Sequence, residues 1–150
     1  MNLSALKSPP FRSYVVSLHL ALNGFWAQRV IIGWLAWEMT GSAGFVGLVA
    51  FLNFFPTLFV SPLFGVFADR IDVRKGSILS YALAGILSAL FAGLCIFGSS
   101  TPVLLALFSF VTGVISSANH PMRMSLTPRL APAGDLPSVV AITSLNFNMS

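Results

Sequence analysis

The chain has 150 residues, of which 56% are hydrophobic and 8% are charged, and its net charge is +4 at pH 7. A soluble domain usually carries about 25% charged residues, so this chain cannot build a polar surface around its apolar residues. The basic residues lie at the ends of apolar runs and do not cluster among aromatics on one wet face, which argues against nucleic-acid binding. We therefore expect an integral membrane protein in contact with the lipid bilayer.

The N-terminus and the single cysteine limit the class further. Lys7 and Arg12 precede an apolar segment longer than the roughly 7–15 residues of a signal-peptide core, and no small-residue cleavage site closes it. We expect that segment to remain as a first membrane helix. Cys95 stands alone, so a disulfide framework and a cysteine-rich metal site are excluded.

Four segments are long and apolar enough to span a bilayer, which takes about 20 residues. The expected helices cover residues 13–39, 45–68, 76–97 and 103–118. A fifth helix is expected to start at Pro137, because proline suits the first turn of a helix. Too few residues follow Pro137 to cross a membrane, so the sequence is expected to be an incomplete fragment of an all-α membrane protein.

The loops predict the orientation of these helices. Seven basic residues fall on one side if the helices alternate, and the two opposite loops have none: Lys7, Arg12, Arg70, Arg74, Lys75, Arg123 and Arg129. The positive-inside rule then places the N-terminus and both charged loops in the cytoplasm. Trp34 and Trp37, near the outer end of the first helix, suit an interfacial aromatic belt.

Small residues recur every four positions on the third and fourth expected helices. The columns are Gly85, Ala89 and Gly93; Ala84, Ser88 and Ala92; and Ser109, Gly113 and Ser117. Small residues at this spacing let membrane helices approach closely, so we expect a tight bundle.

The sequence has no pattern typical of an enzyme, a metal site or a cofactor site. His19 and His120 belong to different segments and have no carboxylate or cysteine nearby, and no phosphate-binding glycine loop or nucleophile elbow occurs. We therefore expect no enzymatic activity, no bound metal and no cofactor.

Polar residues within the first helix are candidates for a substrate or proton pathway. His19 and Asn23 are four residues apart and share a face, while Gln28 and Arg29 lie near the middle. A charge there costs about 2.5–3.5 kcal/mol, so Arg29 is expected to face the bundle interior or a water-filled cavity. Two interpretations stay open for Arg29: a pathway residue, or a structural arginine bonded to backbone carbonyls.

Two further sets of residues have a structural interpretation. Glu38 lies near the outer interface, where a carboxylate is simply solvated. Asn53, Pro56 and Pro62 suggest a kinked second helix that lines or flanks a cavity, because neighbouring helices re-satisfy the backbone at such kinks.

The stretch 65–75 carries five charges, all within its last seven residues, and lies between two long uncharged runs. This pattern is expected for a short aqueous connection between membrane helices. This stretch resembles the loop signature of the major facilitator superfamily, G-x-x-x-D-R-x-G-R-[RK]. Gly65, Asp69, Arg70 and Arg74 stand where that pattern requires them. The chain departs from the pattern at Val73, where arginine is frequent, and at Asp72, which replaces the usual glycine. The aspartate resembles a branch that includes the enterobactin exporter and other drug and siderophore effluxers.

Two other stretches are similar to the same branch. The first stretch, in and just after the first helix, contains Gln28-Arg29, Gly33-Trp34-Leu35 and Thr40-Gly41-Ser42-Ala43. The second stretch, which leads into the fifth helix, contains Pro121, Arg123, Thr127-Pro128, Leu130, Pro132, Leu136, Ser144 and Phe147-Asn148. The resemblance thus extends over nearly the whole chain.

The resemblance implies a conformational latch that stabilises the outward-open state. Gly65 would allow close contact with a helix of the second half, and Asp69 would cap that helix, where negative charge is favourable. Arg70 and Arg74 would be the ionic partners of Asp69 on the cytoplasmic side, and Asp72 and Lys75 belong to the same motif. For Arg74 and Lys75 a purely topological role is equally open.

The resemblance also implies the N-terminal part of a twelve-helix secondary transporter in a bacterial inner membrane. It would export small molecules by alternating access, coupled to protons, together with the missing C-terminal half. Two alternatives stay open: a four-helix transporter that acts as a dimer, and a membrane interaction subunit with no transport role.

Overall fold

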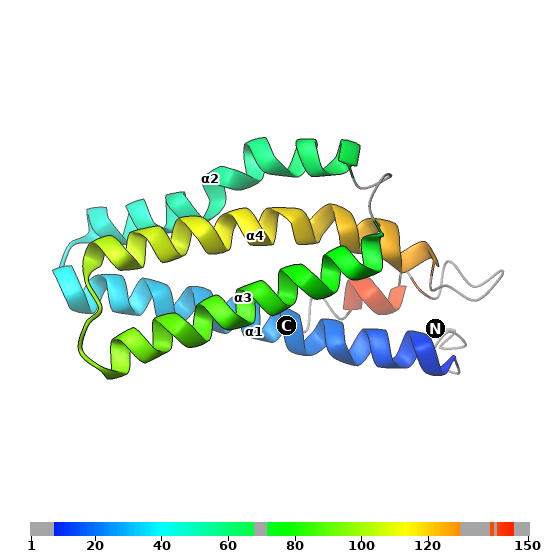
Figure 1. The fold of residues 1–150 in the computed structure, drawn as a ribbon, viewed down its shortest axis with the longest axis horizontal. Helices are drawn as coiled ribbons and strands as arrows, with labels where there is room; N and C mark the ends of the chain where they lie inside the picture. Colours follow the sequence, from blue (N-terminus) through cyan, green and yellow to red (C-terminus); the bar gives the residue numbers. More distant parts are fainter. Residues whose placement is uncertain (1–7, 68–71, 130–138, 140, 146–150) are drawn as a thin grey trace. The chain divides into compact units, whose positions relative to one another are not determined.

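The computed structural model describes residues 8–67, 72–129, 139 and 141–145, with the backbone alone at 10, 64–67, 120 and 123–129. Within these residues the secondary structure consists of helices (Figure 1). The long helices are α1 (Pro9–Thr40), α2 (Ala43–Phe67), α3 (Val73–Ile96) and α4 (Pro102–Arg129). All-α architecture, expected from the apolar runs, is therefore confirmed for the described part of the chain.

The ends of the helices follow from local sequence. Gly41 and Gly98 adopt positive φ angles of 59° and 67° where α1 and α3 end, a conformation that glycine enters without steric cost. Ser42 and Thr101 begin the next helices, because their hydroxyls accept hydrogen bonds from the Phe45 and Leu104 N–H groups at 3.3 Å each.

Helix α4 is longer than the sequence suggested. Its expected end was residue 118, but the helix continues through Pro121 and Pro128 to Arg129. A proline removes one backbone hydrogen bond without ending a helix, and membrane helices tolerate that loss. The expected start of a fifth helix, Pro137, lies outside the described residues, whereas Val139 and residues 141–145 are helical.

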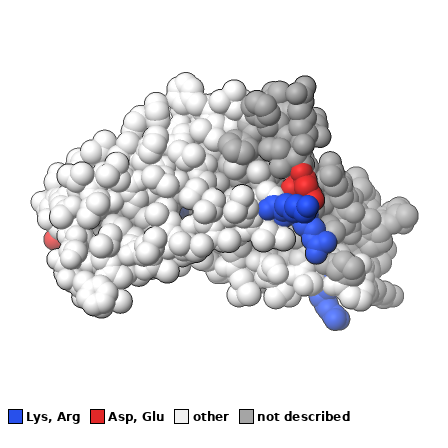
Figure 2. All heavy atoms as spheres, in the orientation of Figure 1, with Lys and Arg blue, Asp and Glu red and all other residues white. Residues whose placement is uncertain are grey.

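All four long helices contain a stretch that is long and apolar enough to cross a membrane. These stretches are Phe11–Thr40, Ala43–Leu63, Val73–Ile96 and Pro102–Asn119. Large hydrophobic side chains are exposed along them, among them Leu58 at 71% and Ile96 at 82%. Among the described residues, charged side chains are sparse on the face drawn in Figure 2. An apolar exterior of this kind is suited to lipid.

The chain divides into two compact units, and the larger one comprises Val30–Arg123. Its core brings together buried residues from all four helices: Ile32, Ala36, Val49, Phe91, Leu105 and Phe108. The Phe91 and Phe108 rings stack, with centroids 4.4 Å apart and planes 12° from parallel. This stack packs α3 against α4 near the centre of the unit.

Within the same unit, a polar seam joins α2 to α4. The Asn53 amide donates to the Ser109 carbonyl at 3.1 Å and to the Thr112 hydroxyl at 3.2 Å. A Cβ added to Gly113 would overlap the Asn53 backbone, lying only 3.0 Å from its carbonyl carbon. The two helices are therefore in backbone contact at Gly113, as the Ser109-Gly113-Ser117 column predicted. By contrast, a Cβ at Gly85 or Gly93 of α3 meets nothing within 4 Å.

The smaller unit contains residues 1–29 and 124–150, of which residues 8–29, 124–129, 139 and 141–145 are described. Phe11 is fully buried against Val139 and Ile142, and Tyr14 and Val15 pack around them. The beginning of α1 is thus held against the helical segment around residue 142.

Candidate functional site

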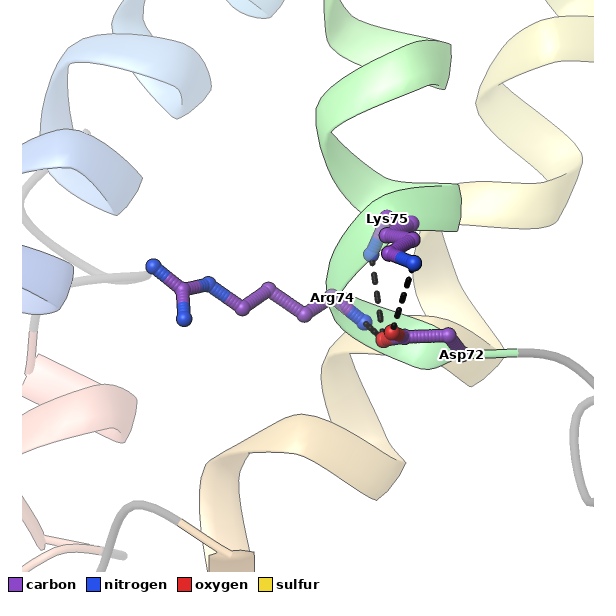
Figure 3. Close-up of polar contacts among 3 residues, drawn as sticks. All are labelled: Asp72, Arg74 and Lys75. Atoms are coloured by element: carbon purple, nitrogen blue, oxygen red, sulfur yellow. Dashed lines mark hydrogen bonds and ion pairs between the residues drawn. The ribbon is translucent and has the colours of Figure 1, made fainter.

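The charged segment begins α3 with a capped helix terminus. The Asp72 carboxylate accepts hydrogen bonds from the backbone N–H groups of Arg74 at 3.1 Å and Lys75 at 3.3 Å (Figure 3). Asp72 has extended backbone angles, φ −63° and ψ 99°, which suit the residue before a helix. Its negative charge also lies where the helix dipole favours it.

The side chains around this cap are largely exposed. Lys75 Nζ lies 3.9 Å from an Asp72 carboxylate oxygen, with the two side chains 85% and 54% exposed. An exposed ion pair at this distance contributes little to stability. The Arg74 side chain points away from Asp72, although its backbone N–H binds that carboxylate (Figure 3). Arg74 therefore presents its charge outside the cap.

The other residues of the predicted latch are placed only in part. Gly65 lies in the last turn of α2, and Asp69 and Arg70 lie outside the described residues. The capping role of Asp72 was missed in the sequence, although an aspartate two residues before a basic pair and an apolar run is a recognisable start signal for a helix.

His19 and Asn23 lie side by side on α1, as their spacing predicted. The Asn23 amide nitrogen lies 3.2 Å from His19 Nε2 and donates to the His19 carbonyl oxygen at 2.9 Å. Both contacts occur within one turn of a single helix. They fix the Asn23 rotamer relative to the imidazole ring.

Arg29 lies against aromatic rings of its own helix. Its guanidinium carbon is 4.9 Å from the Phe25 ring centroid and 5.5 Å from that of Trp26. The two rings meet edge to face, with centroids 5.6 Å apart and an interplanar angle of 71°. Arg29 is partly buried, as is the neighbouring Gln28. Sequence inspection identified the charge but missed the two rings, which precede it by four and three residues.

Near the end of α1, Trp34 Nε1 donates to the Glu38 carboxylate at 3.1 Å, and both residues are exposed. This bond gives Glu38 a local partner one turn away. It agrees with the interpretation of Glu38 as an interfacial carboxylate.

Two polar contacts between helices were not anticipated. The Thr57 and Ser117 hydroxyls lie 3.3 Å apart, and since Ser117 donates to the Gly113 carbonyl at 2.6 Å, Thr57 is the donor between them. The Ser80 hydroxyl donates to the Asn119 side chain, linking α3 to α4. The available signal was the presence of Asn and Thr inside otherwise apolar helices.

No group of three or more His, Cys, Asp or Glu side chains suited to a metal occurs among the described residues. What the described part offers chemically is hydrogen bonding at the Asn53 seam, one cation beside two rings on α1, and a capped, charged start of α3.

Comparison with known proteins assigns the chain to a family. The family model for transmembrane secretion effectors matches residues 1–150. The Staphyloferrin A transporter of Staphylococcus aureus is 23% identical over 136 residues, which cover 89% of this chain and 34% of the relative. The chain thus spans about a third of the length of the curated relative it matches, and no solved structure gives a significant match. This chain belongs to the transmembrane secretion effector family of the major facilitator superfamily.

Proposed function

We propose that the protein is a secondary active transporter that exports small molecules in exchange for protons by alternating access. The observation that carries the proposal is the family match over residues 1–150. Four apolar helices long enough to span a membrane support it. This chain would supply the N-terminal part of the helix bundle, acting with a C-terminal half.

The substrate class and the orientation are part of the same proposal. A relative known as the Staphyloferrin A transporter supports a small-molecule substrate. The basic residues at the N-terminus and in residues 70–75 support a cytoplasmic location for both. The relative is bacterial, which supports a bacterial inner membrane.

We assign the latch role to the segment between α2 and α3. Gly65 would be the contact point with the second half, Asp69 the capping carboxylate, and Arg70 and Arg74 its ionic partners. Asp72 and Lys75 would hold the start of α3 in place behind them, which the N-cap hydrogen bonds support. Arg29, Gln28, Asn23 and His19 would line the substrate or proton pathway.

Proton release in everted bacterial membrane vesicles tests the proposal. Vesicles that contain this chain together with the C-terminal half are energised by respiration, and a fluorescent amine reports the pH gradient. We expect staphyloferrin A, or a cationic probe such as ethidium, to dissipate the gradient, and Asp69→Asn to slow that response. Gly93→Ala is the matched control, because a Cβ there meets nothing within 4 Å. If neither compound releases protons, the proposal of proton-coupled export of these substrates is wrong.

A further inference from the structure

The polar seam between α2 and α4 contains an acceptor that the transport proposal leaves without a role. Asn53 is the middle residue of Ala43–Leu63, a stretch that is long and apolar enough to span a membrane. A polar group at that depth needs a partner from the protein or from a ligand, because hydrocarbon offers none. The question is what the oxygen of the Asn53 amide binds.

The contacts of Asn53 fix the orientation of its amide group. One amide atom lies 3.1 Å from the Ser109 carbonyl oxygen, and since a carbonyl can only accept, that atom is the donor Nδ2. The same nitrogen donates to Thr112 Oγ1 at 3.2 Å. Both amide N–H groups are used in these bonds, which hold Oδ1 in a defined position.

The Asn53 oxygen is open to its surroundings. Oδ1 has no hydrogen-bond partner among the described residues. Every buried side-chain nitrogen or oxygen in that part of the chain does have a partner, so Oδ1 is not one of the buried atoms. An amide oxygen has two lone pairs, and those of Asn53 are therefore available to a donor from outside.

Thr57 adds a second acceptor one turn further along α2. Its proton is used in the contact with Ser117, because the Ser117 hydroxyl donates to the Gly113 carbonyl. Toward any other group the exposed Thr57 hydroxyl can therefore only accept. Residues four apart lie on one face of a helix, and Asn53 and Thr57 both bind α4, so the two acceptors are neighbours.

Two neutral acceptors select a ligand by its charge and its donors. Oxygen lone pairs repel an anion and attract a cation, as the backbone carbonyls of potassium-channel filters do. A primary ammonium group carries three N–H donors on one atom and can bind two oxygens at once, whereas a hydroxyl group has one donor.

We propose that Asn53 Oδ1 and Thr57 Oγ1 form a binding site for the primary ammonium group of a small organic amine. Each oxygen accepts one N–H bond from the ammonium group. The inference rests on the proposed transport function for its biological use, and it adds a chemical class of transported compound.

Equilibrium dialysis of the purified full chain in lipid nanodiscs tests the site, with empty nanodiscs as the blank. The probes are tryptamine and its N,N,N-trimethyl derivative, which share one positive charge and one indole ring, but only tryptamine has ammonium N–H donors. Hydrogen bonds from a charged donor are the stronger kind, so tryptamine should bind about tenfold more tightly. Equal binding of the two probes to the unaltered protein would overturn the inference.

Substitutions separate the two acceptors from the seam that holds them. Asn53→Leu should remove most of the preference for tryptamine, and Thr57→Val should reduce it to about threefold, whereas Thr57→Ser keeps the oxygen and the preference. Thr112→Val and Ser117→Ala are the matched controls, because they remove seam contacts on α4 and leave both acceptors in place.

The controls decide between binding and structure. If Asn53→Leu does not fold, the comparison of Thr57→Val with Thr57→Ser decides the matter. A preference that Thr57→Val leaves unchanged, or one that Thr112→Val lowers as much as Thr57→Val does, would overturn the inference.

The outcome is separable from that of the transport proposal. Proton release by staphyloferrin A or ethidium without a preference for tryptamine would overturn the site and leave the transporter intact. A preference for tryptamine that is reduced in Thr57→Val, without any proton release, would support the site and overturn proton-coupled export.

Discussion

The contact between α2 and α4 at Gly113 makes a direct prediction about stability. Gly113→Ala adds a methyl group where the Asn53 backbone already lies, 3.0 Å from the new carbon at the carbonyl carbon and 3.1 Å at Cα. The obstacle is backbone, which cannot rotate away as the end of a flexible side chain can. The two helices must therefore separate locally.

The expected magnitude combines three contributions. Overpacking of a close contact costs about 1–3 kcal/mol. Separation also weakens the three hydrogen bonds from Asn53 and Thr57 to α4, each contributing about 0.6 kcal/mol inside a membrane. Alanine recovers about 1 kcal/mol because it favours helix more than glycine does. The net loss is about 2 kcal/mol, which for a chain of this size lowers Tm by about 4–8 °C.

Thermal unfolding in detergent, followed by tryptophan fluorescence, measures this difference. Gly93→Ala is the matched variant, because it makes the same chemical change inside α3 with nothing within 4 Å of the new carbon. It should leave Tm unchanged or raise it by a few degrees, to about 4 °C at most. If Gly113→Ala melts at the wild-type temperature, or if both variants lose the same amount, the close approach of α2 and α4 is not what determines their stability.

Three further substitutions test other contacts by the same melting assay. Asn53→Ala removes two hydrogen bonds to α4 and should lower the free energy of unfolding by about 1 kcal/mol. Asn23→Ala loses contacts only within α1 and should change it by no more than about 0.5 kcal/mol, so equal losses would show that the Asn53 contacts do not stabilise the pair of helices. Asp72→Ala removes the cap of α3 and should lower the free energy of unfolding by about 1 kcal/mol, while Asp72→Asn keeps a capping oxygen and should lower it by about a few tenths of a kcal/mol. A large loss in Asp72→Asn would show that the negative charge matters more than the capping hydrogen bonds. Phe91→Ala breaks the stack with Phe108 and should destabilise clearly, though by less than the roughly 3–5 kcal/mol of a soluble core, because lipid replaces part of the lost contact. Phe97→Ala, at a ring that is 84% exposed, should change Tm little, and an equal loss there would contradict the core assignment.

The parts of the fold that depend on a single helix could be predicted from the sequence. Apolar runs give the four helices, and the four-residue spacing of His19 and Asn23 gives their contact. Spacings of three and four residues also bring Trp26 and Phe25 next to Arg29. A chain with fourteen phenylalanines offers many pairs at such spacings, so this contact is visible only in the structure.

The small-residue column predicted a close approach at Gly113, but which side chains bind one another between helices was beyond prediction, because it depends on how each helix is rotated about its axis. Asn53 and Ser109 are 56 residues apart, and nothing in either segment names the other. The end of α4 was misplaced for a different reason. Residues 103–118 were expected as the helix, but the turns before Pro121 are held by hydrogen bonds to α2 and α3, so losing one backbone hydrogen bond at this proline does not end the helix.

Helix α2 shows how these contacts combine along one element. Figure 1 shows a bend partway along α2, and the helix contains Pro56 and Pro62. Pro56 cannot donate to the carbonyl one turn before it. The two seam residues, Asn53 and Thr57, lie on either side of Pro56 and bind α4. These hydrogen bonds therefore hold α2 against α4 on both sides of Pro56, which compensates for the missing backbone hydrogen bond.

Position 72 is one of two at which this chain departs from the family signature, and the contacts of Asp72 give a physical account of that departure. The signature has glycine there, and glycine is itself an acceptable residue before a helix, only a few tenths of a kcal/mol worse than aspartate. Aspartate stabilises this position without any contact to another half of a transporter. Its carboxylate accepts hydrogen bonds from two backbone N–H groups of α3, and the helix dipole favours its negative charge. The departure thus strengthens the start of α3. It follows that substitutions at positions 69 and 72 should have separate consequences, with Asp72 acting on the stability of α3 and Asp69 on the proposed latch.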